Sequence, residues 1–113
     1  MPSIADTAAG FIVVWEFEVA RETATEFEQL YGPDGGWAKL FSQSPGYLKT
    51  DLLRDTVNSN RYTTVDYWRS RTEYDQFKQQ HAAEYLQLDQ QGERWTTAER
   101  LVGTIDPDAT ARA

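Results

Sequence analysis

The chain of 113 residues is long enough for one domain with a packed core and too short for two such domains. Its net charge of −7 comes from 18 acidic and 11 basic residues, so nucleic acids and anionic membranes are not expected as partners. The absence of cysteine excludes a disulfide framework and makes a cytoplasmic location the expected one. With a single histidine as well, no transition-metal site is expected.

The two ends of the chain differ in composition from its middle. Residues 1–9 and 106–113 are small and polar, which predicts flexible tails. The first residues have neither a basic start nor an apolar run, so they do not resemble a secretory signal. We therefore expect one folded domain that spans residues 10–105.

Residues 11–19 (FIVVWEFEV) predict the first strand, because they are rich in β-branched and aromatic side chains. The odd-numbered positions of this segment are all apolar and would share one face. Ile12 and Val14 make the other face apolar too, until Glu16 and Glu18. Both faces of the first half of the strand are therefore expected to be covered.

Two short helical pieces and two strands are expected next. Thr23 or Thr25 can cap a helix that ends near the sequence YGPDGG, where proline and glycine interrupt it. A second helical piece follows at residues 37–42. Residues 47–55 and 61–69 are expected to be the second and third strands, and the sequence NSN between them predicts a hairpin turn.

The only histidine of the chain lies in the last predicted helix, residues 71–89. Its apolar and aromatic residues recur every three or four positions, which places them on one helix face: Tyr74, Phe77, His81, Tyr85 and Leu88. Residues 95–106 predict a fourth strand. The complete order is β-α-β-β-α-β, typical of a ferredoxin-like α+β fold with an antiparallel four-stranded sheet and both helical segments on one face.

The predicted fold leaves one sheet face without helices, although the first strand is apolar on both sides. An exposed apolar sheet face would exceed the patch size that monomers usually tolerate. We therefore expect a homodimer that packs sheet against sheet.

The element order, together with the segments YGPDGGWAKLF, SPGYLKTDLLRD and RYTTVDYWRS, resembles the antibiotic biosynthesis monooxygenase (ABM) family of dimeric α/β barrels. The resemblance covers about residues 11–105. It implies a homodimer with a pocket between sheet and helices in each subunit and, for several relatives, oxygenation without metal or organic cofactor. The tryptophan and histidine of the haem-degrading branch would fall on Phe77 and Gln87, so haem degradation is not expected.

His81 is the first candidate for a catalytic residue. Imidazole exchanges protons near neutral pH, so it could act as the base that activates a phenol or quinol for reaction with dioxygen. Tyr85, one turn later, could donate a hydrogen bond to the substrate. The alternative is structural: a partly buried histidine that bonds a backbone carbonyl or Tyr85.

Four aromatic residues are candidates for binding a planar substrate: Trp15, Trp68, Tyr74 and Phe77. The resemblance supports Trp68, which matches an aromatic residue that the family often has at the end of the third strand. Aromatic residues at helical or strand spacing are, however, more often part of an ordinary core.

The charged residues of the strands have two interpretations. An arginine at the pocket mouth could stabilise a developing phenolate, and the candidates cluster near the hairpin and the third strand: Arg54, Arg61, Arg69 and Arg71. Asp51 and Asp66 lie inside predicted strands, where a carboxylate is unfavourable unless it is paired. We expect each of these aspartates to pair with a lysine or an arginine.

Three functions are compatible with the sequence. The leading one is a cofactor-independent monooxygenase for an aromatic phenol, quinol or polyketide-like small molecule. The second is a non-catalytic homodimer that binds a small ligand or serves a structural purpose. The third is a proton-transfer enzyme, such as an isomerase or decarboxylase, which would use the same base and pocket.

Overall fold

The structure is a computed structural model that describes residues 9–106. Its elements follow the expected order: β1 (Phe11–Val19), η2 (Arg21–Thr23), α1 (Ala24–Tyr31), α2 (Gly36–Phe41), β2 (Tyr47–Arg54), β3 (Arg61–Trp68), α3 (Arg71–Gln80), α4 (Ala82–Glu93) and β4 (Thr96–Ile105). The flexible tails predicted at residues 1–9 and 106–113 lie outside the described residues except for Ala9, which is buried, and Asp106, which is exposed.

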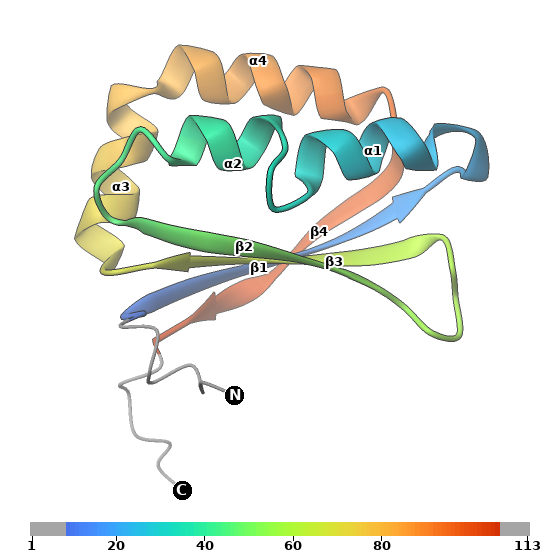
Figure 1. Cartoon of the computed structure of the whole chain (residues 1–113), viewed down its shortest axis with the longest axis horizontal. Helices are drawn as coiled ribbons and strands as arrows, with labels where there is room; N and C mark the ends of the chain where they lie inside the picture. Colours follow the sequence, from blue (N-terminus) through green and yellow to red (C-terminus); the bar gives the residue numbers. More distant parts are fainter. Residues whose placement is uncertain (1–8, 107–113) are drawn as a thin grey trace, which may run out of the picture.

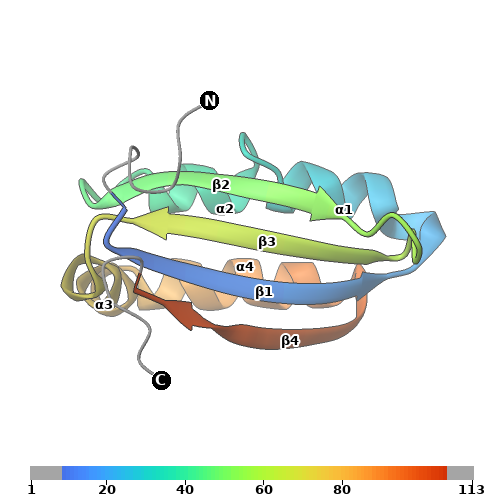
Figure 2. The ribbon, with the colours of Figure 1, turned by 90° about the horizontal axis from the view of Figure 1, so that it is seen from below.

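The four strands form one antiparallel sheet in the order β2-β3-β1-β4. All helices lie on one face of this sheet (Figure 1), and the opposite face carries none of them (Figure 2). The ferredoxin-like α+β prediction is thereby confirmed. Within residues 9–106, no helix is long and apolar enough to cross a membrane.

The predicted single helix over residues 71–89 is wrong in one respect, because it is divided at His81. This residue has φ −119° and ψ 30°, so α3 ends before it and α4 begins after it. Hydrogen bonds from His81 N to Phe77 O (2.9 Å) and from Tyr85 N to His81 O (2.8 Å) still bridge the division. The division lets α3 lie across one end of the sheet while α4 runs along it (Figure 1).

The main core lies between the sheet and the helices. The odd-numbered side chains of β1 face it, as the alternation predicted, and the largest side chains with almost no exposed surface are Trp68, Phe27 and Phe77. Phe27 stacks on Tyr31 with ring centroids 4.3 Å apart. This aromatic core holds the helices on the sheet and so positions the residues described below.

The helix-free face of the sheet is apolar at one end. Ala9, Ile12 and Tyr67 are buried there, and Val14, Leu48 and Val65 pack against them. The first half of β1 is therefore covered on both faces at Phe11, Ile12 and Val13, which are buried, and less completely at Val14, which is partly buried.

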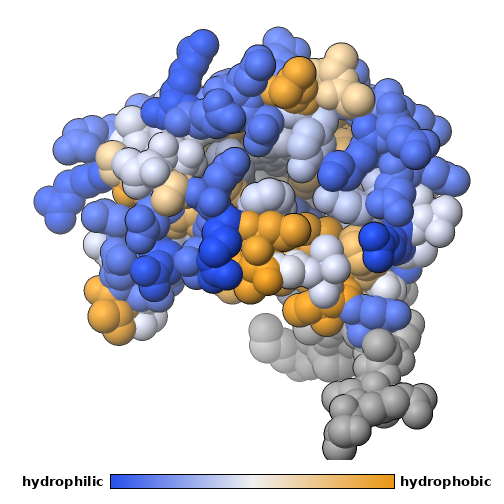
Figure 3. Space-filling model, turned by 180° about the vertical axis from the view of Figure 1, so that it is seen from behind, coloured by the Kyte–Doolittle hydropathy of each residue, from blue (hydrophilic) through white to orange (hydrophobic). Residues whose placement is uncertain are grey.

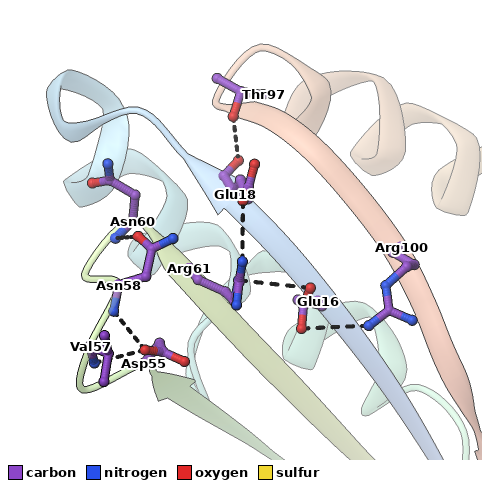
Figure 4. A network of polar contacts seen from close by, with 9 residues as sticks. All are labelled: Glu16, Glu18, Asp55, Val57, Asn58, Asn60, Arg61, Thr97 and Arg100. Atoms are coloured by element: carbon purple, nitrogen blue, oxygen red, sulfur yellow. Dashed lines mark hydrogen bonds and ion pairs between the residues drawn. The ribbon is translucent and has the colours of Figure 1, made fainter.

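The other end of the same face is charged (Figure 4). Arg61 of β3 lies between Glu16 and Glu18 of β1, with nitrogen–oxygen distances of 3.8 and 3.6 Å. Arg100 of β4 lies 3.6 Å from the second carboxylate oxygen of Glu16. Exposed pairs of this length contribute little to stability, but they give the face alternating charge. In the neighbouring hairpin, Asp55 accepts backbone hydrogen bonds from Val57 and Asn58, which form the predicted turn.

Candidate functional site

A pocket lies between the helix-bearing face of the sheet and the helices, and every strand and α-helix contributes to its wall. The lining residues are Trp15, Phe17, Tyr31, Trp37, Phe41, Thr50, Thr64, Asp66, Tyr74, Tyr85, Asp89 and Glu99. The pocket is partly open to solvent, and its free volume is about 40 Å³. Drug-sized ligands usually occupy roughly 300 Å³ or more, so a fused-ring ligand requires the lining side chains to move apart.

The side chain that distinguishes this pocket is Asp66, which is 8% exposed and lies on β3. Its Oδ1 accepts a hydrogen bond of 2.6 Å from the hydroxyl of Thr50, which in turn lies 2.7 Å from the hydroxyl of Tyr47. Burial raises the pKa of Asp66 to about 7, and the hydrogen bond from Thr50 opposes this rise only in part. A carboxyl group with this pKa can accept and return a proton near neutral pH.

The expectation that both strand aspartates pair with a basic residue is correct for Asp51 and wrong for Asp66. Asp51 lies 3.6 Å from Lys49 Nζ and accepts a hydrogen bond of 3.0 Å from Tyr67. The ion pairs among residues 9–106 do not include Asp66. Asp66 shares the helix-bearing side of β3 with Thr64 and Trp68, because alternate residues of a strand share a face. That alternation was the signal in the sequence that could have placed Asp66 inside the site.

Three tyrosines of the pocket remain protonated at neutral pH. Burial raises the pKa of Tyr31 and Tyr74 well above the usual range of tyrosine. Burial also raises the pKa of Tyr85 to about 12, with further contributions from Asp89, Asp66 and Glu99. Trp37 packs edge-on against Tyr85 with centroids 4.9 Å apart. The pocket therefore combines one titratable acid with hydroxyl groups that can donate hydrogen bonds.

Residues 10–87 match a family model described as "Antibiotic biosynthesis monooxygenase". The chain belongs to the antibiotic biosynthesis monooxygenase family. This finding confirms the resemblance stated from the sequence.

Solved structures share the fold of this ABM chain at low sequence identity. The cofactor-independent oxygenase SnoaB from Streptomyces nogalater, in a mutant form, is 20% identical, with a TM-score of 0.72 over 88% of this chain and 94% of the other. The monooxygenase ActVA-Orf6 from Streptomyces coelicolor, in complex with the ligand nanaomycin D, is 17% identical, with a TM-score of 0.76 over 99% of both chains. A conserved protein from Methanosarcina mazei is 13% identical, with a TM-score of 0.66 over 88% of this chain and 94% of the other. No curated protein matches the chain.

Three of the site residues predicted from the sequence line the ABM pocket, namely Trp15, Tyr74 and Tyr85. Trp68 and Phe77 do not line it, because they lie in the core with 0% and 1% exposure. Their rings contact Phe41, a lining residue, at centroid distances of 5.4 and 5.3 Å. They therefore support the wall of the pocket from behind.

His81 is not one of the lining residues of the pocket. Its ring stacks on Phe77 with centroids 5.1 Å apart, and its Nδ1 lies 2.8 Å from Glu84 Oε2. Both contacts are local to the point where α3 meets α4. His81 therefore contacts Phe77, which in turn contacts the lining residue Phe41, but the histidine itself does not reach the pocket.

The arginines considered as phenolate-stabilising groups also lie elsewhere. None of Arg54, Arg61, Arg69 and Arg71 lines the pocket. Arg71 pairs with Asp75 on α3 at 3.7 Å, and Arg54 donates to the backbone carbonyl of Ser59. Within residues 9–106, the structure contains no group of three or more His, Cys, Asp or Glu side chains that could hold a metal ion.

Proposed function

We propose that this protein is a cofactor-independent monooxygenase that oxidises an aromatic phenol, quinol or polyketide-like substrate, with Asp66 as the general base. The observation that carries the proposal is a buried carboxyl group with a pKa near neutrality, in an aromatic pocket of an ABM-family chain. SnoaB and ActVA-Orf6, which share the fold, are described as an oxygenase and a monooxygenase, and this supports the reaction class.

The base is assigned to Asp66 instead of His81 because only Asp66 borders the space that a substrate can occupy. Tyr85 keeps the role proposed from the sequence, as a protonated hydroxyl that donates to a substrate oxygen. Trp15 and Tyr74 supply aromatic surface for a planar ring, and Trp68 and Phe77 hold that surface in place from the core.

A simple phenol illustrates how the reaction balances. The Asp66 carboxylate accepts the phenol proton, and the phenolate transfers one electron to dioxygen, giving a phenoxyl radical and superoxide. These two join through a new C–O bond at the ring carbon para to the phenol oxygen, and the peroxide anion takes the proton back from Asp66. Asp66 then removes the ring C–H proton, the O–O bond breaks, and the departing hydroxide takes that proton as water. The phenol and dioxygen become a quinone and water without an external reductant.

The experiment that tests this proposal measures oxygen consumption and product oxygen content with two probes, 1-naphthol and anthrone, in metal-free buffer. We expect 1,4-naphthoquinone and anthraquinone, each with one ¹⁸O atom when the reaction is run under ¹⁸O₂, at rates above the enzyme-free background. Oxidation that follows added metal, or product oxygen derived from water, would contradict the proposal.

A non-catalytic binding protein is the competing function, because an aromatic pocket can hold a small ligand without acting on it. Such a protein would show saturable quenching of tryptophan fluorescence by the same probes, because Trp15 and Trp37 line the pocket. It would form no quinone. The two functions are therefore separated by product formation and not by binding.

We also propose that the protein is a homodimer in which the helix-free sheet faces pack together. Ile105 of β4, which pairs with Ile12, adds a half-exposed apolar side chain to the apolar end of this face. Figure 3 shows the molecule from behind, where apolar side chains are exposed among hydrophilic ones in the lower half of the picture. The other end of the face carries both acidic and basic residues, so a second copy of the chain can meet it with residues of opposite charge.

Replacing Val65 by lysine is expected to convert the dimer to a monomer, because the substitution places a charge in the centre of the apolar cluster on the helix-free face. Multi-angle light scattering at micromolar concentration measures this directly. The matched control is Thr97→Lys, an exposed position at the end of β4, which should leave the dimer intact. A wild-type protein of monomer mass at this concentration would contradict the proposal.

A further inference from the structure

The pocket has an unusual balance of side chains. Seven of its twelve lining residues are aromatic, three are carboxylic acids, and none is basic. An acidic, aromatic wall without a basic residue is poorly suited to an anionic ligand, since the phenolate of the proposed reaction would form beside like charges. The ligand itself must therefore supply positive charge if these carboxylates are to be neutralised.

The acids lie on three different elements around the cavity. Asp66 comes from β3, Asp89 from α4 and Glu99 from β4, the strand at the edge of the sheet. Their negative charges act on two tyrosines of the pocket. After burial, the charges of Asp89, Asp66 and Glu99 are the next causes that raise the pKa of Tyr85. The charges of Glu99 and Asp89 also raise the pKa of Tyr31. The negative charges of the three carboxyl groups therefore all act on the interior of the pocket.

These acids have few partners within the chain. The ion pairs among the described residues include none of the three, and their side-chain hydrogen bonds consist of the one from Thr50 to Asp66 Oδ1. The second oxygen of Asp66, a residue 8% exposed, has no hydrogen-bond partner there. Burial and the charges of Asp89 and Glu93 raise the pKa of Glu99, as expected of a partly buried acid that lacks a counterion.

The aromatic rings of the wall are also suited to a cation. Ammonium groups bind favourably to the faces of tryptophan and tyrosine rings, and cages of such rings recognise substituted amines. Tyr74 and Tyr85 already attract one ammonium group, that of Lys78, which lies 5.4 Å from each ring centroid. Lys78 itself does not line the cavity, so its charge does not occupy the space between Asp89 and Glu99.

We propose that the natural ligand is an aromatic molecule that carries a protonated amine, with its ammonium group bound between Asp89 and Glu99 against the aromatic wall. This part of the inference needs no catalysis. The orientation of the ligand rests on the proposed function: the ammonium group is held near the acids of α4 and β4, and the phenol hydroxyl points to Asp66. The positive charge of the ligand then offsets the repulsion between the developing phenolate and the surrounding carboxylates.

The test uses three phenols of similar shape that differ in charge: tyramine (cationic), tyrosol (neutral) and 4-hydroxyphenylacetate (anionic). Isothermal titration calorimetry at low ionic strength and neutral pH is expected to give tyramine about tenfold higher affinity than tyrosol, with 4-hydroxyphenylacetate the weakest. The double variant Asp89→Asn/Glu99→Gln should bind tyramine no better than tyrosol and should retain the affinity for tyrosol.

The matched control removes the same number of charges away from the pocket. Glu22→Gln/Glu26→Gln changes two exposed residues of η2 and α1, and it should keep the full preference for tyramine. Equal affinity for tyramine and tyrosol, a preference for 4-hydroxyphenylacetate, or no binding of tyramine overturns the inference. A loss of preference in the control variant overturns it as well, because it would assign the effect to net charge.

The outcome is separable from that of the proposed function. If tyramine is preferred and neither 1-naphthol nor anthrone is oxidised, the cationic-ligand site stands and the monooxygenase proposal fails. If quinones form but tyramine has no preference, the monooxygenase proposal stands and this inference fails.

Discussion

Replacing Asp66 by asparagine is expected to lower kcat/KM for the oxidation of 1-naphthol by about 10²- to 10⁴-fold, the usual contribution of a positioned general base. The amide has nearly the same shape as the carboxyl group and can still accept the hydrogen bond from Thr50, so the pocket should keep its form. It cannot accept a proton from the substrate. Steady-state oxygen consumption at several substrate concentrations measures the loss, and circular dichroism checks that the variant is folded.

The pH dependence gives the same assignment a second test. Because burial raises the pKa of Asp66 to about 7, its base form grows about tenfold per unit below that pH and levels off above it. The kcat/KM of the wild-type protein should follow this curve, and the residual rate of Asp66→Asn should not. A His81→Gln variant decides between the two candidate bases. A large loss in that variant, with Asp66→Asn still active, would return the role to the histidine.

The fold was predictable from the sequence because its signals are local and repeated. β-branched and aromatic residues at 11–19 identified the first strand, and the YGPDGG segment marked a helix interruption through proline and glycine. The interruption at His81 could not be predicted in this way, since neither residue type occurs there. It depends on α3 and α4 lying in different directions on the same sheet, which is a property of the tertiary structure.

The site was less predictable than the fold for a similar reason. Trp68 and Phe77 are chemically suitable as pocket walls, and only packing shows that their rings are covered on all sides. The general rule that strand carboxylates are paired held for Asp51, which has Lys49 two residues earlier, and failed for Asp66. Whether an acid in a strand faces a lysine or a cavity is decided by the neighbouring strand and the helices above it.

The second large effect concerns stability, and it requires no substrate. The pKa of Asp66 is about 7 in the folded chain, and that of an unfolded aspartate is about 3.9. Between these values the folded state binds a proton that the unfolded state has released, so the free energy of unfolding falls as the pH rises through this window. The stability from the protonated carboxyl group is fully present below about pH 4 and is lost as the pH passes about 7.

The Asp66→Asn variant isolates this contribution, because its side chain is neutral at every pH of the window. We expect the difference in the free energy of unfolding, wild type minus variant, to fall by roughly 4 kcal/mol between pH 4 and pH 8 in urea titrations at constant protein concentration. Asp51→Asn is the matched control, because Asp51 lies on the adjacent strand, is partly exposed and pairs with Lys49. The difference in the free energy of unfolding between wild type and this variant should change much less over the same pH range. If the free energies of unfolding of wild type and Asp66→Asn change in parallel with pH, Asp66 ionises in the folded protein as it does in water. In that case Asp66 would lack the near-neutral pKa on which its assignment as the general base rests.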